Sequence, residues 1–221
     1  MGTELAKNQV HRARMHGYNS RGAGVCRIMG RAVFVDRALA GEEWDVLILK
    51  AASSAVYGKG LRLIGEPSPE RRDPACEVFG KCGGCDLMHM SYAGELSFKL
   101  ARVNDAVSRI AGLNFRIGEI VGASAQKLHH YRNKAIYAVG RDMNLRAVTG
   151  FFRERSHGVV PAPNCLIQTE LSSRAAAALR EFIDKTGVSV YDESTHTGLI
   201  RNLYVRCSRR LPQAVACVVA A

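Results

Sequence analysis

The residues of this sequence best suited to chemistry are three cysteines that lie close together in the chain. Five residues separate Cys76 from Cys82, and two glycines separate Cys82 from Cys85. Because glycine carries no bulky side chain, Gly83 and Gly84 permit the tight turn that brings the last two thiols together. Thiolates are soft ligands that suit zinc or an iron–sulfur cluster. The spacing therefore predicts a metal centre in this segment.

Three local thiolates need a fourth ligand, and two residues are candidates. Cys165 is the better one, because Pro161 and Pro163 stiffen the chain just before it. His89 follows Cys85 by four residues and could instead complete a zinc site. Tetrahedral zinc sites commonly use two paired knuckles, whereas this sequence has a single CxxC pair. Spacing alone does not separate zinc from iron–sulfur.

The other cysteines call for a simpler explanation. The sequence has 7 cysteines, an odd number, and it begins without an apolar export signal, so a disulfide framework is not expected. Cys26, Cys207 and Cys217 lie in apolar, strand-like runs. We expect them to be buried structural thiols.

The charge of the chain indicates the kind of partner. Lys and Arg number 31 and Asp and Glu number 20, which leaves a net charge of +11. A spread positive field favours a polyanion, of which nucleic acid is the commonest. No apolar run is long enough to span a membrane, so the sequence indicates a soluble, cytoplasmic protein without a membrane partner.

Two basic segments contain aromatic residues, as RNA-binding surfaces often do. They are residues 129–134 and residues 150–157. In the first, Arg132 can fork onto a phosphate and Lys134 can neutralise another, which makes both candidate RNA contacts. Arg21 is a weaker candidate in a glycine-rich turn that lacks the patterns of a nucleotide-binding loop. The alternative is a solvated basic face without a ligand.

The elements that must position these residues fall into two parts. Up to Glu66, short apolar runs punctuated by glycine predict a small all-β barrel. Residues 66–74 contain three prolines and alternating charges, which is typical of a linker. We therefore expect one domain over residues 1–66 and a second over residues 67–221.

The second part reads as mixed α/β. Apolar residues at three- and four-residue steps predict a helix over residues 95–110 and another over residues 170–185. Thr169 is the expected N-cap of the second helix, and Gly187 follows its end. Strands are expected over the following ranges, the last of them buried: 135–139, 150–153, 199–207 and 214–219.

These pieces, in this order, resemble bacterial RNA uracil-5 methyltransferases that modify ribosomal or transfer RNA. Residues 16–42 resemble the TRAM domain of that family, an OB-like RNA-binding barrel, and residues 68–92 resemble the segment with the first three cluster ligands. Residues 131–165 resemble the central domain that ends on the fourth ligand. The resemblance implies a [4Fe–4S] cluster, rather than zinc with His89, on four cysteines: Cys76, Cys82, Cys85 and Cys165.

The resemblance also sets the expected fold class and activity. It implies an α+β chain with a TRAM barrel, an iron–sulfur central domain and a C-terminal Rossmann-like methyltransferase domain that is largely absent. No glycine-rich strand-to-helix turn follows Cys165 in the sequence. We therefore expect a fragment or truncated product without catalytic residues, inactive by itself, with S-adenosylmethionine bound only in the missing domain.

The implied chemistry begins from the poor nucleophilicity of uracil C5. A cysteine thiolate adds to C6, the resulting enolate takes the methyl group at C5, and a base removes the C5 proton. The uridine must leave its stack first, so the expected partner is structured RNA, with 23S rRNA favoured over tRNA, bound by a monomer. The alternative is a stand-alone RNA-binding module with a structural metal centre. A radical enzyme fits less well, because such sites typically use CxxxCxxC.

Overall fold

The computed structural model describes residues 4–221, which form two compact units. The first unit runs through Ala75 and resumes over Asp86–Gly122. The second consists of Cys76–Cys85 together with Ala123–Ala221. Each unit is thus built from two separate stretches of chain, and the cysteine loop belongs to the second unit although both its flanks belong to the first.

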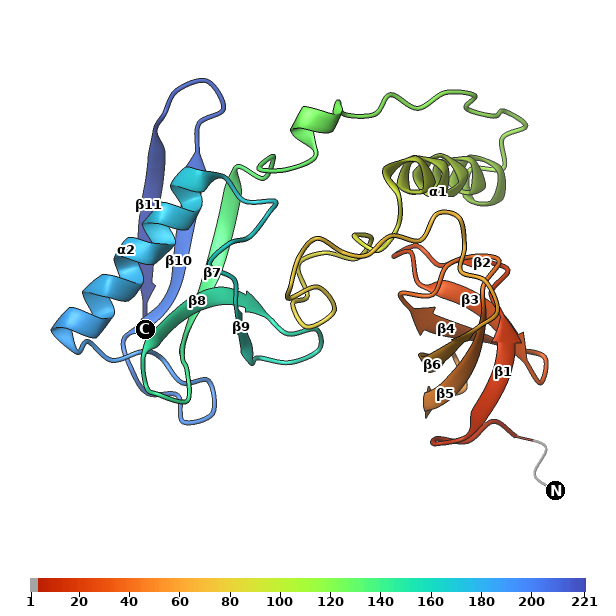
Figure 1. Ribbon diagram of the computed structural model, residues 1–221, viewed down its shortest axis with the longest axis horizontal. Coiled ribbons are helices and arrows are strands. Elements are labelled where there is room, and N and C mark those ends of the chain that lie inside the picture. The colour runs from red at the N-terminus through yellow and green to blue at the C-terminus, as the bar shows by residue number, and fades with distance from the viewer. Residues whose placement is uncertain (1–3) are drawn as a thin grey trace. The chain divides into compact units, whose positions relative to one another are not determined.

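The first unit is built on a six-stranded sheet in the order β1-β5-β6-β4-β3-β2 (Figure 1). Only the β4–β6 pair is parallel; the other pairs are antiparallel. This agrees with the all-β pattern expected from the glycine-punctuated runs. The strands are β1 (Val10–Arg14), β2 (Gly17–Tyr18), β3 (Gly24–Ile28), β4 (Arg31–Asp36), β5 (Glu43–Ala51) and β6 (Val56–Ile64).

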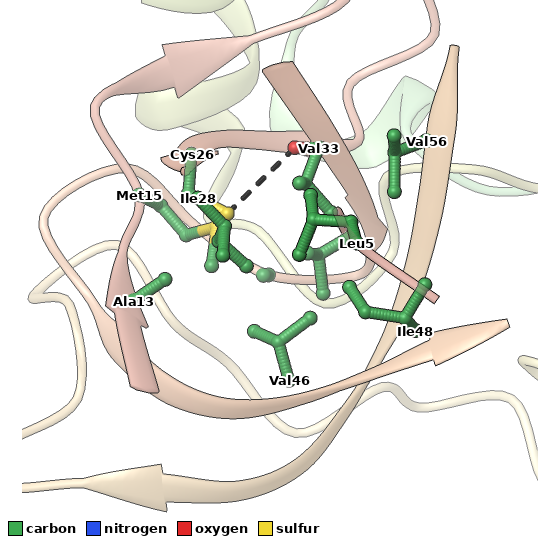
Figure 2. Packing of buried hydrophobic residues seen from close by; sticks show 11 residues of the cluster. Leu5, Ala13, Met15, Cys26, Ile28, Val33, Val46, Ile48 and Val56 are labelled. Atoms are coloured by element: carbon green, nitrogen blue, oxygen red, sulfur yellow. Dashed lines mark hydrogen bonds between the residues drawn. The ribbon is translucent and has the colours of Figure 1, made fainter. Parts of the chain in front are cut away.

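Alternating strand residues supply the core of this unit. Val33 and Val35 in β4 are fully buried, as are Val46 and Ile48 in β5, because every second side chain points to the same face. Figure 2 shows Val33, Val46 and Ile48 in this core. Cys26 lies among them, and its Sγ is 3.8 Å from the carbonyl oxygen of Val33. Burial raises the pKa of the Cys26 thiol to about 11. The expectation of a buried structural thiol is confirmed at this position.

A helix in the first unit follows the cysteine loop. Helix α1 (Tyr92–Asp105) begins after Ser91, whose side chain accepts a hydrogen bond from the backbone N–H of Gly94 at 3.0 Å. It continues into a π-helical turn, η1 (Ala106–Ile110). The apolar pattern predicted a start at residue 95, which is too late, because the capped first turn contributes nothing to the apolar stripe.

The second unit contains a five-stranded antiparallel sheet in the order β11-β10-β7-β8-β9. Helix α2 (Glu170–Thr186) lies across one face of this sheet (Figure 1). A short 3-10 turn, η2 (Ala125–Lys127), precedes the sheet. The strands are β7 (Lys134–Arg141), β8 (Ala147–Phe152), β9 (Val159–Pro161), β10 (Ile200–Cys207) and β11 (Ala214–Ala220).

Helix α2 matches the sequence expectation closely. The Thr169 side chain accepts a hydrogen bond from the Ser172 N–H at 3.2 Å, and Gly187 ends the helix at a φ of 69°. Leu179 and Ile183 are buried in the core cluster shared by the helix and the sheet. Tyr137 of β7 joins that core, with its hydroxyl 3.0 Å from Ser172 Oγ.

Strand β11 differs from its expectation. The sequence predicted a buried strand, but all its residues are exposed, including Cys217. It lies at the sheet edge, where the described residues pair it with β10 alone, and the core cluster under α2 contains none of its residues. Cys207, in β10, is buried as predicted. Within residues 4–221, neither helix is long and apolar enough to cross a membrane.

Candidate metal centre and nucleic-acid surface

The cysteine loop is fixed to the second unit through its backbone. Cys82 forms a β-bridge with Arg153, and the N–H of Gly83 donates to the carbonyl of Phe152 at 3.0 Å. A Cβ at Gly83 would lie 3.1 Å from that carbonyl oxygen. A larger residue would therefore loosen the contact, which explains the glycine beside Cys82.

Hydrogen bonds within the loop also hold its backbone in place. The N–H of Phe79 donates to the carbonyl of Cys76 at 3.0 Å, and the N–H of Cys82 donates to that of Val78 at 2.9 Å. The N–H of Gly84 lies 3.4 Å from Cys82 Sγ. Backbone N–H groups that point at a sulfur favour its thiolate form.

Cys165 comes from a segment held beside the first basic stretch. The N–H of His130 donates to Leu166 O at 2.8 Å, and that of Arg132 donates to Ile167 O at 2.9 Å. The N–H of Gln168 closes a turn onto the Cys165 carbonyl at 3.3 Å. These bonds place the predicted fourth ligand and the predicted RNA contact Arg132 in adjoining segments.

Charged groups on both segments shift the pKa values of the cysteine thiols. Burial raises the pKa of Cys85 to about 11, and the neighbouring Cys165 thiol adds to the rise. The pKa of Cys82 is also raised, first by burial and further by Cys165 and Cys76, while Arg132 lowers both values. The four predicted ligands thus share one neighbourhood with one cation.

The side chains in this neighbourhood do not have the geometry of a metal site. Across residues 4–221, no three His, Cys, Asp or Glu side chains are grouped closely enough to hold a metal ion as they stand. His89, the alternative zinc ligand, lies in the first unit and is 2% exposed. The donor set, four half-buried thiols beside an arginine, fits an iron–sulfur cluster chemically. The ligand assignment remains a prediction.

The predicted RNA contacts differ in their surroundings. Arg132 and Lys134 are exposed, and neither forms an ion pair with a carboxylate in the described part of the chain. Arg21, in contrast, lies 3.3 Å from Asp86 through its Nη2 atom. An RNA phosphate would have to compete with that carboxylate. The Arg21 backbone is held in a turn by the side chain of Asn19, as the sequence indicated.

Sequence reasoning missed two residues that the sheet places beside Lys134. Arg206 lies directly across from Lys134, and Tyr204 lies across from Ile136. Their relation depends on strand register, which no local motif encodes. Only the alternation of residues 199–207 could have shown which side chains share a face.

Comparison with protein-family models finds no match. Curated relatives are found in sequence. The chain is 35% identical over 215 residues to a protein of Clostridium tetani named as an uncharacterized RNA methyltransferase, covering 97% of this chain and 46% of that protein. A protein of the same description from Halalkalibacterium halodurans is 32% identical over 215 residues. The chain spans about half the length of the curated relatives it matches.

A solved structure shares the fold. The tRNA (uracil-54, C5)-methyltransferase of Pyrococcus abyssi, determined in complex with S-adenosyl-L-homocysteine, matches with a TM-score of 0.69 and 22% sequence identity. The match covers 95% of this chain and 46% of the solved chain.

This match corrects the fold class expected from sequence. We expected a TRAM barrel and an iron–sulfur central domain, with the Rossmann-like methyltransferase domain largely absent. That description is wrong, because 95% of the chain matches a solved methyltransferase and 97% aligns with a curated RNA methyltransferase. The comparisons likewise give no support to the expectations that the chain is a fragment or is inactive by itself. The chain is similar in sequence to curated RNA methyltransferases, and it shares its fold with the matched part of a tRNA methyltransferase.

Proposed function

We propose that this chain functions in S-adenosylmethionine-dependent methylation of uridine C5 in RNA, and that its described residues bind the RNA. The similarity to curated RNA methyltransferases over 97% of the chain carries this proposal. The solved structural neighbour is a uracil C5 methyltransferase, which supports the choice of atom. The net charge of +11 suits an RNA partner.

A gene deletion tests the reaction. Loss of one 5-methyluridine from total RNA, measured by nucleoside mass spectrometry and restored by the intact gene, is the expected result. An unchanged 5-methyluridine content would contradict the enzymatic part of the proposal. RNA binding by the chain would then favour a binding module.

We place the target in ribosomal RNA, because the cysteine block resembles that of the ribosomal members of the family. The solved neighbour, in contrast, is a tRNA methyltransferase. The two targets separate in the same deletion strain. A lost methyl group in purified 23S rRNA supports the ribosomal target, whereas a loss confined to tRNA contradicts it.

We also propose that Cys76, Cys82, Cys85 and Cys165 hold a [4Fe–4S] cluster. When bound, such a cluster would supply a structural tie between the loop and the Cys165 segment, since methyl transfer needs no redox step. Four thiolates around a cluster carry net negative charge, and Arg132 beside the thiols offsets part of it. A TRAM-like part and a cluster-bearing part belong to the same proposal; the division expected after residue 66 differs from the compact units, of which the first also contains Asp86–Gly122.

Metal analysis of anaerobically purified protein tests the cluster. We expect about four iron and four acid-labile sulfide per chain, and a brown colour. Cys165→Ser should lose iron nearly as fully as Cys82→Ser, whereas Cys217→Ser, at an exposed thiol, is the matched control. One equivalent of zinc without sulfide would contradict the assignment.

In the RNA-binding part of the proposal, Arg132 and Lys134 contact phosphate. Arg132→Ala should weaken binding of a structured RNA by about 1–3 kcal/mol, and the salt dependence of the affinity should become shallower. Arg174→Ala is the matched control, because Arg174 is an exposed residue of α2. A lowered melting temperature with unchanged affinity would mean that Arg132 has a structural role instead.

A further inference from the structure

The five-stranded sheet of the second unit has one covered face and one open face. On β7, Ala135 and Tyr137 belong to the core cluster under α2. Because side chains alternate along a strand, Lys134 and Ile136 point to the opposite face. Ile136 is 52% exposed, although it lies in the central strand of the sheet. Ala138, two positions further along β7 on the same face, is 3% exposed, so the open part of this face lies around Lys134 and Ile136.

Two cations lie side by side at one end of the open face. Arg206 of β10 is the direct cross-strand partner of Lys134 of β7, and both are exposed. Like charges directly opposite each other destabilise a sheet. Among the ion pairs of residues 4–221, neither residue has a carboxylate partner. A negatively charged ligand would be attracted to both side chains and would offset the repulsion between them.

More positive charge lies in the turn next to this pair. The N–H of Cys207 donates to the carbonyl of Asn133 at 2.8 Å, so the β7–β10 pairing continues past Arg206 toward the turn. Arg209 and Arg210 follow in that turn, and both are exposed. This end of the sheet therefore presents successive cations, as the backbone of a nucleic-acid strand requires.

An aromatic ring occupies the next position along the face. Tyr204 is the cross-strand partner of Ile136 on β7 and of Cys217 on β11. Its neighbours Leu203 and Val205 are buried under α2, so alternation turns Tyr204 to the open face, where it is partly exposed. A ring flanked by the apolar side chains of Ile136 and Cys217 is a surface on which a nucleobase can stack.

We propose that this open face binds a single-stranded segment of RNA, with a base stacked on Tyr204 and phosphates held by Lys134, Arg206 and the Arg209–Arg210 turn. The inference rests on the proposed function and extends it from single contacts to a defined surface. The clustered cations without carboxylate partners favour RNA over a protein occupant. A second protein surface would leave their charge uncompensated unless it were acidic.

Substitutions on the face test the proposal through RNA affinity. Tyr204→Leu should weaken binding of a uridine-rich, single-stranded RNA by roughly tenfold, whereas Tyr204→Phe should keep it, because stacking needs the ring and not the hydroxyl. Arg206→Gln should weaken binding by a similar factor and flatten its salt dependence. Arg174→Gln removes one exposed charge from α2, on the covered side of the sheet, and should leave affinity unchanged.

Cys217 provides a second measurement that does not depend on the stability of a variant. Its thiol is exposed and lies opposite Tyr204. Bound RNA should slow its alkylation at least severalfold, as followed by mass spectrometry of the modified peptide. Alkylation that is equally fast with and without saturating RNA would overturn the proposal.

The outcomes also separate this inference from the proposed function. If Arg132→Ala weakens RNA binding while Tyr204→Leu and Arg206→Gln do not, the RNA surface lies elsewhere and only the inference fails. If the unaltered chain binds no RNA, both fail. If Cys217 is already protected from alkylation in the absence of RNA, a protein segment covers the face and the inference is overturned.

Discussion

The guanidinium of Arg71 lies against a carboxylate that has no contact with solvent: its Nη2 donates to Oε2 of Glu42 at 2.7 Å. The same carboxylate accepts from the Leu39 N–H at 2.8 Å and from Trp44 Nε1 at 2.9 Å. Arg71 comes from the proline-rich segment that the sequence marked as a linker. This part of the linker is therefore fixed to the sheet.

Removing either partner of this pair should destabilise the first unit. Arg71→Ala leaves the Glu42 charge buried without its main cation, so we expect a loss of about 3 kcal/mol in the free energy of unfolding. Urea denaturation followed by Trp44 fluorescence measures it. Arg72→Ala, at the exposed neighbour, is the control. Equal stability of the two variants would contradict a stabilising role for Arg71.

Acid should destabilise the first unit through His89. Burial, followed by the charge of Arg71, lowers the pKa of His89 from 6.5 to about 4. The unfolded chain therefore takes up a proton between these pH values and the folded chain does not, so stability falls as pH drops from about 6.5 to about 4. The expected loss is on the order of 3 kcal/mol. Denaturation in a pH series should show this fall, and His89→Gln should flatten it.

Glu42 acts in the same direction at lower pH. Burial raises its pKa, but the hydrogen bonds from Arg71 and neighbouring groups outweigh that and leave the pKa lowered. A carboxyl with a lowered pKa stabilises the fold above its unfolded value and loses that contribution as pH falls through the folded value. In the same pH series, Glu42→Gln should therefore remove part of the fall below the range of His89. A parallel curve for this variant would show that Glu42 does not contribute.

Gly150 should tolerate no side chain. It lies in β8 beside β9, and an added Cβ would overlap the carbonyl of Val160. Gly150→Ala has to push the two strands apart, so we expect a loss of about 2 kcal/mol or more. Gly158→Ala, where the nearest atom would be at 3.5 Å, is the matched control. Thermal melting compares them, and similar melting temperatures would show that β9 yields easily.

The N-cap of α2 makes a smaller contribution to the free energy of unfolding, and this contribution can be measured separately. Thr169 accepts from the Ser172 N–H and donates to Cys207 Sγ at 3.0 Å. Thr169→Ala should cost about 1 kcal/mol, because one N–H of the first turn loses its acceptor. Thr169→Ser keeps the hydroxyl and should recover most of that stability. If both substitutions cost the same, the methyl group rather than the cap matters.

Local patterns predicted much of the second unit. Helix α2 could be predicted because its apolar stripe, Thr169 and Gly187 are all encoded within one stretch of sequence. Strands β10 and β11 could be predicted for the same reason. Exposure could not be predicted in this way: the apolar run 214–220 looks buried, yet none of its residues joins the core cluster under α2 and Cys217 is exposed.

The candidate site was predictable only in part. The spacing of Cys76, Cys82 and Cys85 marks them within ten residues, whereas their neighbourhood with Cys165 and Arg132 arises from tertiary pairing. The fold class was wrong for a related reason. It depended on a resemblance in local motifs and on the absence of a glycine-rich turn after Cys165, whereas the match to a methyltransferase depends on the arrangement of 95% of the chain.

Each unit consists of two separate stretches of chain, and this affects the order in which the parts of each unit are synthesised. The cysteine loop is synthesised before α1, yet it belongs to the second unit, whose other residues are synthesised after α1. Domains tend to fold as units, N-terminal first, so the first unit can fold once Asp86–Gly122 has been synthesised. At that stage Cys76, Cys82 and Cys85 still lack the strands on which their loop docks. During translation these three thiols are therefore open to oxidation or to stray metal ions until the segment of Cys165 emerges.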